Sequence, residues 1–132
     1  MKTIKPILLV ALIAFTLACG YSKPKSTPPV AGTTPTISAL NPNDATAGGS
    51  GFTLTVNGAN FNSNAQVNWN GAAQTTAYVS GNQLTVSVPA SLIADSGSVS
   101  VTVTNPGNPG SGIYGTGATQ AETSSAMTFV IN

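Results

Sequence analysis

Side chains that could do chemistry are scarce in this chain of 132 residues. There is no histidine, the single cysteine is Cys19, and the carboxylates are Asp44, Asp95 and Glu122. A hydrolase with an activated nucleophile needs a base beside it, which is usually histidine. A glycosidase needs two carboxylates across one site, whereas these three fall in different predicted turns or loops. We therefore predict that the protein is not an enzyme and has no catalytic residue.

Two short segments contain groups that bind ions in other contexts. Residues 41–44, "NPND", offer oxygen ligands, but a single carboxylate makes a weak calcium site. Asp44 is better explained by bonds to the backbone of its own turn. Residues 115–117, "GTG", are not flanked by the strand and helix that a phosphate-binding loop requires. The sequence therefore predicts neither a metal site nor a cofactor.

The N-terminus has the features of a secretory signal peptide. Lys2 and Lys5 precede a largely apolar run over residues 7–18, which ends in small residues before Cys19. The run has about twelve residues, whereas a helix that crosses a bilayer needs about 20. A spanning helix is the weaker interpretation, and we expect residues 1–18 to be removed during export across the inner membrane.

The position of Cys19 decides what this cysteine does. The stretch "TLAC" resembles the lipobox of bacterial lipoproteins, with Ala18 at −1 and Leu17 at −2, although Thr16 replaces the usual leucine at −3. The resemblance implies cleavage before Cys19 and attachment of lipid to its thiol. Ordinary cleavage at the same bond, leaving a free cysteine, is the alternative. Gly20 at +2 is not the aspartate that retains some lipoproteins at the inner membrane, so we expect an outer-membrane location, facing the periplasm or the exterior.

Residues 19–34 are rich in proline, serine, threonine and glycine, which predicts a flexible tether behind the lipidated cysteine. Lys23 and Lys25 are the last basic residues, and none follows Pro35. Nucleic-acid binding depends on lysine and arginine that neutralise phosphates. The domain after the tether is therefore predicted not to bind nucleic acid.

From Pro35 onward, apolar side chains alternate with threonine, serine and asparagine, which is the pattern of strands with one buried face. Seven such segments are present, at residues 36–40, 52–58, 65–71, 75–79, 83–89, 97–106 and 126–132. The spacing in the first indicates a β-bulge. Residues 89–95 predict a single helical turn that places Leu92 or Ile93 in the core. Turns are expected at 57–58, 70–71, 80–82 and 96–97. Seven short strands predict an all-β, antiparallel β-sandwich.

The order of these motifs resembles that of an IPT/TIG domain. The resemblance runs from "PTISALNP" through "AGGSGFTLTVNGANF", "VNWNGAAQTTAYVSGNQLTVSVPASLI" and "VSVTVTNPG" to "MTFVI", which assigns residues 35–132 to the domain. It implies an immunoglobulin-like fold in which Trp69 fills the core and Phe61 plugs one end of the sandwich. The family is a scaffold found in cell-surface receptors, transcription factors, carbohydrate-active enzymes and bacterial envelope proteins. The fold therefore does not fix an activity.

The connection over residues 107–125 is longer than the family usually has, and connections beyond about 12–15 residues tend to be functional or disordered. Ile113 and Tyr114 lie in its middle and are candidate contact residues, with a plain insertion as the alternative. We expect a non-enzymatic, lipid-anchored envelope protein for adhesion, scaffolding or protein contact. Its expected partners are the membrane, through the anchor, and an unidentified envelope protein or glycan. A carbohydrate-binding module that uses Tyr114 or Tyr78 with asparagine side chains is the alternative.

Overall fold

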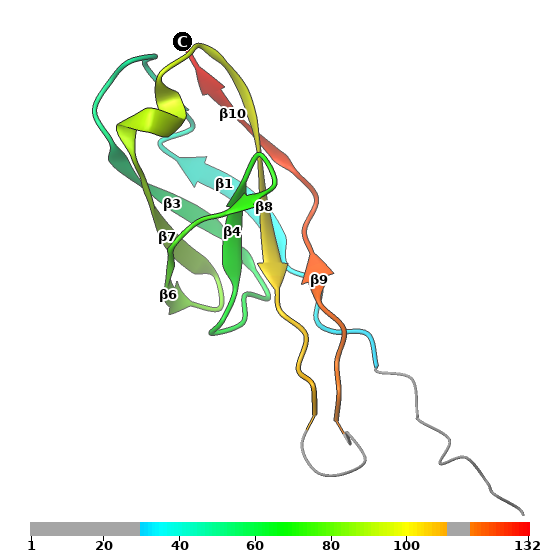
Figure 1. Ribbon diagram of the computed structural model, residues 1–132. Coiled ribbons are helices and arrows are strands. Elements are labelled where there is room, and N and C mark those ends of the chain that lie inside the picture. The colour runs from blue at the N-terminus through cyan, green and yellow to red at the C-terminus, as the bar shows by residue number, and fades with distance from the viewer. Residues whose placement is uncertain (1–29, 111–116) are drawn as a thin grey trace, which may run out of the picture.

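The computed structural model describes residues 30–110 and 117–132, which form a β-sandwich of two sheets (Figure 1). The first sheet has the order β1 (Thr36–Asn41), β3 (Phe52–Ala59), β7 (Gln83–Val88) and β6 (Thr76–Ser80). The second has the order β2 (Asp44–Ala45), β10 (Met127–Ile131), β8 (Gly97–Asn105), β4 (Gln66–Trp69) and β5 (Ala72–Ala73), and β9 (Glu122–Thr123) also pairs with β8. The predicted sandwich is confirmed, and each of the seven predicted strands is present.

The alternating apolar residues meet between the sheets, because successive side chains of a strand point to opposite faces. The buried set includes Leu54, Val56, Leu84, Val86, Val88, Val99, Val101 and Val103. Phe129 is fully buried at their centre, with ring centroids 5.7 Å from Phe52 and 5.0 Å from Trp69. The prediction that Trp69 fills the core is confirmed.

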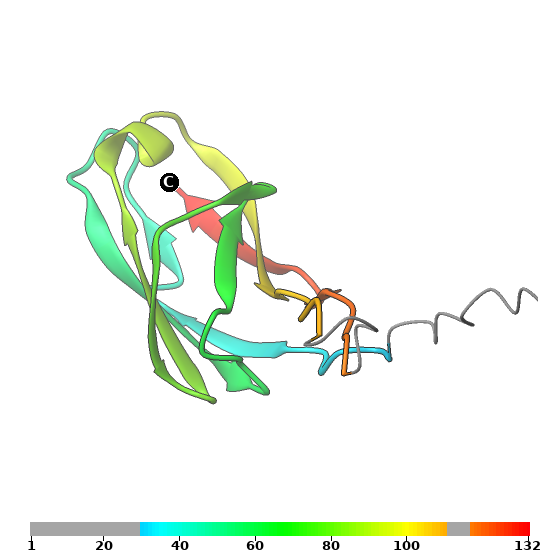
Figure 2. The ribbon, with the colours of Figure 1, turned by 60° about the horizontal axis from the view of Figure 1, so that its bottom comes forward.

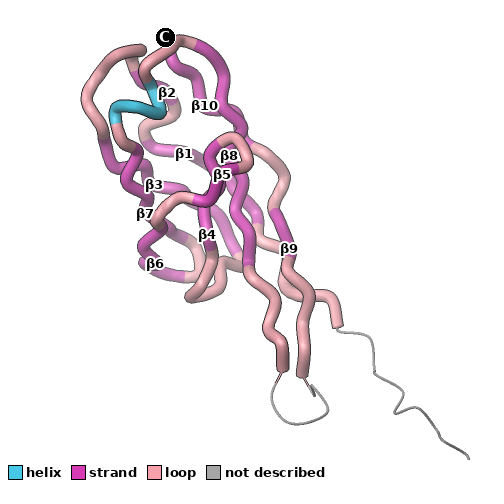
Figure 3. Tube along the Cα trace, in the orientation of Figure 1, coloured by secondary structure: helices cyan, strands magenta, loops and turns pink. Residues whose placement is uncertain are grey.

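Neighbouring strands are antiparallel, except that β2 runs parallel to β10. Figure 3 shows β2 beside β10. After β1 the chain crosses to the other sheet to make this two-residue pairing. The sequence did not predict it, because two residues are too few to show an alternating pattern. The register of β1 against β3 shifts between Ile37 and Ala39. That shift confirms the predicted bulge.

The Asn70-Gly71 turn is confirmed. Both residues have positive φ, 53° and 87°, and they connect β4 to β5 through the Trp69–Ala72 pair. Positive φ at both central residues is the mark of the tight hairpin turn that Asn-Gly favours.

The predicted turn at Asn57-Gly58 is wrong, because β3 continues to Ala59. Gly58 pairs with Ile37, and a Cβ atom at Gly58 would overlap the carbonyl oxygen of Thr36 and lie 2.6 Å from the ring of Phe61. Glycine is therefore needed for close approach of the neighbouring strand. Phe61 is buried, as predicted for an end plug.

Different segments of the chain lie at the two ends of the sandwich. One, which we call the C-terminal end, carries the last residue and the 3-10 helix η1 (Ala90–Ile93). Ile93 of this helix is 1% exposed, which confirms the predicted helical turn and its core residue. The N-terminal segment (residues 30–35) and the connection after β8 both leave the opposite end, which we call the tethered end (Figures 1 and 2).

Candidate binding site at the tethered end

The connection between β8 and β10 is not a simple loop. Thr104 pairs with Thr123 and Asn105 with Glu122. Beyond them, Thr119 donates its backbone N–H to the carbonyl of Asn108 at 2.8 Å. We call residues 105–109 and 118–123 the hairpin stem. The connection over 107–125, whose length indicated either a functional or a disordered segment, is thus paired in this stem, whereas the candidate contact residues Ile113 and Tyr114 lie outside the described residues.

The N-terminal segment lies along this stem in a parallel direction. Val30 donates its N–H to the carbonyl of Ala118 at 3.1 Å and accepts a bond from the N–H of Gln120 at 3.0 Å. The sequence placed residues 19–34 in the tether, but residues 30–34 are attached to the domain. The C-terminal part of the predicted tether is thus paired with the stem from Val30 onward, whereas Cys19 and residues 1–18 lie outside the described residues.

A buried asparagine joins the segments at this end. Asn105 is 1% exposed. Its side-chain Nδ2 donates to the carbonyls of Thr33 and Asn60, each at 2.7 Å, and its Oδ1 accepts the N–H of Asn62 at 3.0 Å. Sequence reasoning missed this residue. The signal was its position, because Asn105 continues the inward series 99, 101 and 103, where an amide must find partners.

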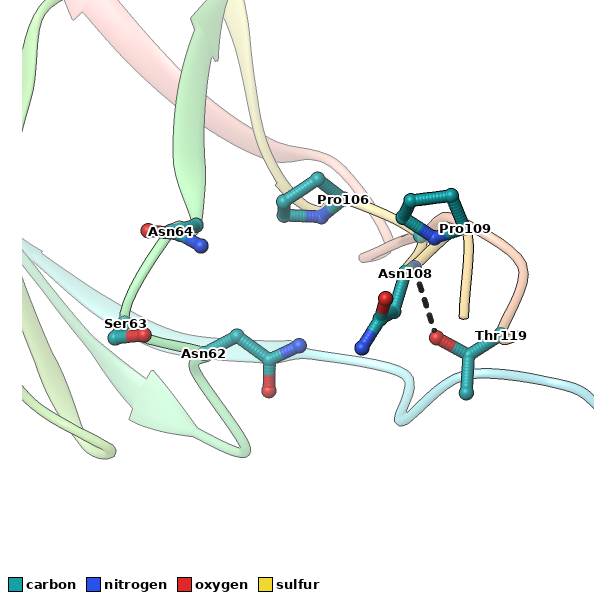
Figure 4. A pocket seen from close by; sticks show the side chains of 8 residues that line it. Asn62, Ser63, Asn64, Pro106, Asn108, Pro109 and Thr119 are labelled. Atoms are coloured by element: carbon teal, nitrogen blue, oxygen red, sulfur yellow. Dashed lines mark hydrogen bonds between the residues drawn. The ribbon is translucent and has the colours of Figure 1, made fainter. Parts of the chain in front are cut away.

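A polar groove lies between the hairpin stem and the corner that follows β3. Its volume is about 440 Å³, and it is lined by Asn62, Ser63, Asn64, Pro106, Gly107, Asn108, Pro109 and Thr119. The side-chain amides of Asn62 and Asn108 point toward one another from opposite walls (Figure 4). A second hollow of about 450 Å³ lies on the other side of Ser63 and Asn64 and continues to β6. Together they form an open surface suited to binding through neutral hydrogen bonds.

The three carboxylates do not meet at this surface. Asp44 and Asp95 lie at the C-terminal end, and Glu122 lies in the hairpin stem. Asp44 accepts a bond from Nδ2 of Asn132 at 3.1 Å, instead of the predicted bonds to its own turn. Within residues 30–110 and 117–132, no three His, Cys, Asp or Glu residues gather as metal ligands would.

Tyr78 is 45% exposed on the edge strand β6. The candidate sugar contact named from the sequence thus lies at the edge of the first sheet.

In the same described ranges, no helix has the length and apolar character needed to cross a bilayer.

The fold agrees with a comparison against protein-family models. The model described as the IPT/TIG domain matches residues 35–129, which is well over half of the chain. No curated protein matches the chain. IPT/TIG domains are non-catalytic, immunoglobulin-like modules that often serve protein–protein contact. The chain, with its sandwich, its core tryptophan and this match, belongs to the IPT/TIG family.

Proposed function

We propose that this is a non-enzymatic, lipid-anchored protein of the cell envelope that displays one IPT/TIG domain for adhesion, scaffolding or protein contact. The signal-peptide pattern and the position of Cys19 support the anchor. The family supports a contact role. Gly20, which stands where some lipoproteins carry the aspartate of inner-membrane retention, supports outer-membrane placement on the periplasmic or external side.

The observation that carries the proposal is the shared exit of the N-terminal segment and the hairpin stem from the tethered end (Figure 2). Cys19 precedes Val30 by eleven residues, which can span at most about 40 Å. A lipid on Cys19 therefore keeps the hairpin close to the membrane surface. Partners that lie in or near the same membrane are the ones this arrangement presents to the hairpin.

The anchor is tested by a Cys19→Ser variant, followed by acyl labelling and membrane fractionation. We expect the variant to lose the label and to leave the membrane fraction, because no thiol remains to take the lipid. A Ser22→Ala variant, three residues away in the tether, should be labelled like the natural protein. Equal labelling of the Cys19→Ser form would refute the anchor, and recovery from the inner membrane alone would refute outer-membrane placement.

The contact role is tested by crosslinking in intact cells. The full chain is compared with a form in which residues 110–117 are replaced by a short turn, which keeps the stem pairs. A protein crosslinked by the full chain and lost from the shortened form supports contact through the hairpin. Failure of both forms to capture any envelope protein contradicts a contact role.

A carbohydrate-binding module is the second candidate. The uncharged amide and hydroxyl lining of the groove favours it, because sugar hydroxyls both donate and accept hydrogen bonds. Loop-mediated sugar binding is tested by retention on glycan-containing affinity gels. Tyr114→Ala should reduce retention, and unchanged retention would count against a role of that loop.

A further inference from the structure

We propose that the two hollows on either side of Ser63 and Asn64 form one extended site for a neutral oligosaccharide. This inference rests on the second candidate function and adds to it the site and the class of ligand. The ridge of Ser63 and Asn64 lines both hollows, so a chain of sugar rings would cross it.

The lining selects an uncharged, polyhydroxylated ligand. Besides the ridge, the second hollow is lined by Ala65, Gln66, Gln74, Thr75 and Thr76. No charged side chain lines either hollow. A phosphate or carboxylate ligand would be desolvated here without a counter-charge, at a large cost. Amides and hydroxyls instead offer the mixture of donors and acceptors that sugar hydroxyls match.

The backbone positions that carry Asn62 and Asn108 in the first hollow are fixed before any ligand arrives. The backbone of Asn62 is fixed by its N–H bond to Oδ1 of buried Asn105. The backbone of Asn108 is fixed twice by Thr119, through the N–H of Asn108 to Thr119 Oγ1 at 3.0 Å and through the carbonyl of Asn108. Such preorganisation lowers the entropic cost of binding.

The side chains that face the first hollow have bonding capacity to spare. Among the described residues, no group bonds the side-chain amides of Asn62 and Asn64. Oδ1 of Asn108 accepts the N–H of Gly110 at 2.9 Å, which leaves its Nδ2 to donate. Asn62 and Asn108 approach from opposite walls (Figure 4), so a single sugar ring can bond to both.

The length of the site favours a chain of sugars over a single ring. The hollows measure about 440 and 450 Å³ and share a wall. Pro106 and Pro109 give the first hollow apolar faces for sugar C–H groups. Tyr78 follows Thr76 by two residues, hence on the same face of β6, and the residue is 45% exposed.

The test uses the full chain in detergent and measures binding of chitohexaose, cellohexaose and mannohexaose by calorimetry. We expect at least one of them to bind, and the double variant Asn62→Ala/Asn108→Ala to lose about tenfold or more in affinity through its lost hydrogen bonds. Asn43→Ala, an exposed asparagine away from both hollows, is the matched control and should bind like the natural chain. Ser63→Ile adds bulk to the exposed ridge without touching the core, and it should also weaken binding.

The proposed site would be overturned if none of the three probes bound. It would also be overturned if the double variant and Ser63→Ile both bound the probes as tightly as the natural chain does. Either result leaves the anchor and the protein-contact role untouched, because acyl labelling and crosslinking measure those separately. Loss of binding in the Asn43→Ala control would also count against the site, since that residue lies outside it.

Discussion

The two ends of this sandwich are closed by different chemistry. At the C-terminal end, η1 places the apolar side chain of Ile93 between the sheets. At the tethered end, Phe61 supplies a similar plug, but Asn105 lies buried in the same region and bonds three separate segments. Apolar burial is non-directional and stabilises any compact arrangement. A buried amide needs partners in fixed places, so it determines where neighbouring segments run.

The surfaces of the two ends differ in the same sense. The hollow at the C-terminal end, about 370 Å³, has the apolar side chains of Trp69, Leu92 and Ile131 in its lining and Asp95 beside them. The groove at the tethered end has amides and hydroxyls with no charge. The comparison teaches that apolar packing closes one end, whereas a buried amide at the other end also fixes the positions of the segments that meet there.

The largest expected effect is at the C-terminal end. Ile93→Ala removes a buried plug and leaves a cavity, which should lower the free energy of unfolding by about 3 kcal/mol. Urea denaturation of the natural chain and the variant measures this difference. Leu92→Ala, the half-buried neighbour, is the control and should cost less. An equally large loss of unfolding free energy in Leu92→Ala would show that the buried side chain of Ile93 contributes no more to stability than its half-buried neighbour.

Asn105→Ala should cost about 2 kcal/mol, because the N–H of Asn62 and the carbonyls of Thr33 and Asn60 lose their partner. This loss is directional, so its effect should be local as well. Hydrogen exchange should quicken at the N–H groups of Val30 and Gln120, which hold the N-terminal segment to the stem. In Ile93→Ala these amides should change no more than the rest of the domain. Equal local protection in both variants would remove the contrast between the ends.

Val30→Pro is a finer test of the same attachment. Proline has no N–H, so the bond from Val30 to the carbonyl of Ala118 is lost. Because this bond is exposed, we expect a change in global stability of about 0.5 kcal/mol or less. Proteolysis between residues 25 and 35 should nevertheless become faster. Cleavage at the natural rate would show that this bond does not hold the segment.

The smallest effect is expected from the form with residues 110–117 replaced by a short turn. Loop length enters stability only logarithmically, and the stem pairs are kept, so thermal and urea midpoints should remain nearly unchanged. A large loss of stability would show that the tip belongs to the folding unit rather than to the exposed surface.

The sequence predicted β3, β4, β7, β8 and β10 because each has one buried face and hence an alternating pattern. The η1 turn and the Asn70-Gly71 turn were predicted for similarly local reasons, whereas the family resemblance implied the core position of Trp69. Gly58 was misassigned because glycine after asparagine signals a turn, whereas here it admits the backbone of β1. The local residue pair cannot report a neighbour that arrives from elsewhere in the chain.

The candidate site was harder to predict than the fold. The hairpin stem and the N-terminal segment pair through backbone groups, which every residue carries, so their side chains show no pattern. The groove forms only when residues 62–64 meet residues 106–109. Composition did indicate its neutral chemistry, since no basic residue follows Pro35. Asn105 was the one recognisable sign that segments converge there.

The parallel pairing of Val30 with the stem has a mechanical consequence. A pull on the chain upstream of Val30 acts along the strand axis, so the bonds to residues 118 and 120 are loaded in shear and must yield together rather than one by one. The load then passes to β1, which is held along its length by β3. The C-terminal end, with Ile93 and the last strand, lies outside this path and carries no load. The force would thus act first beside the groove, where Asn105 bonds both the N-terminal segment and the corner after β3.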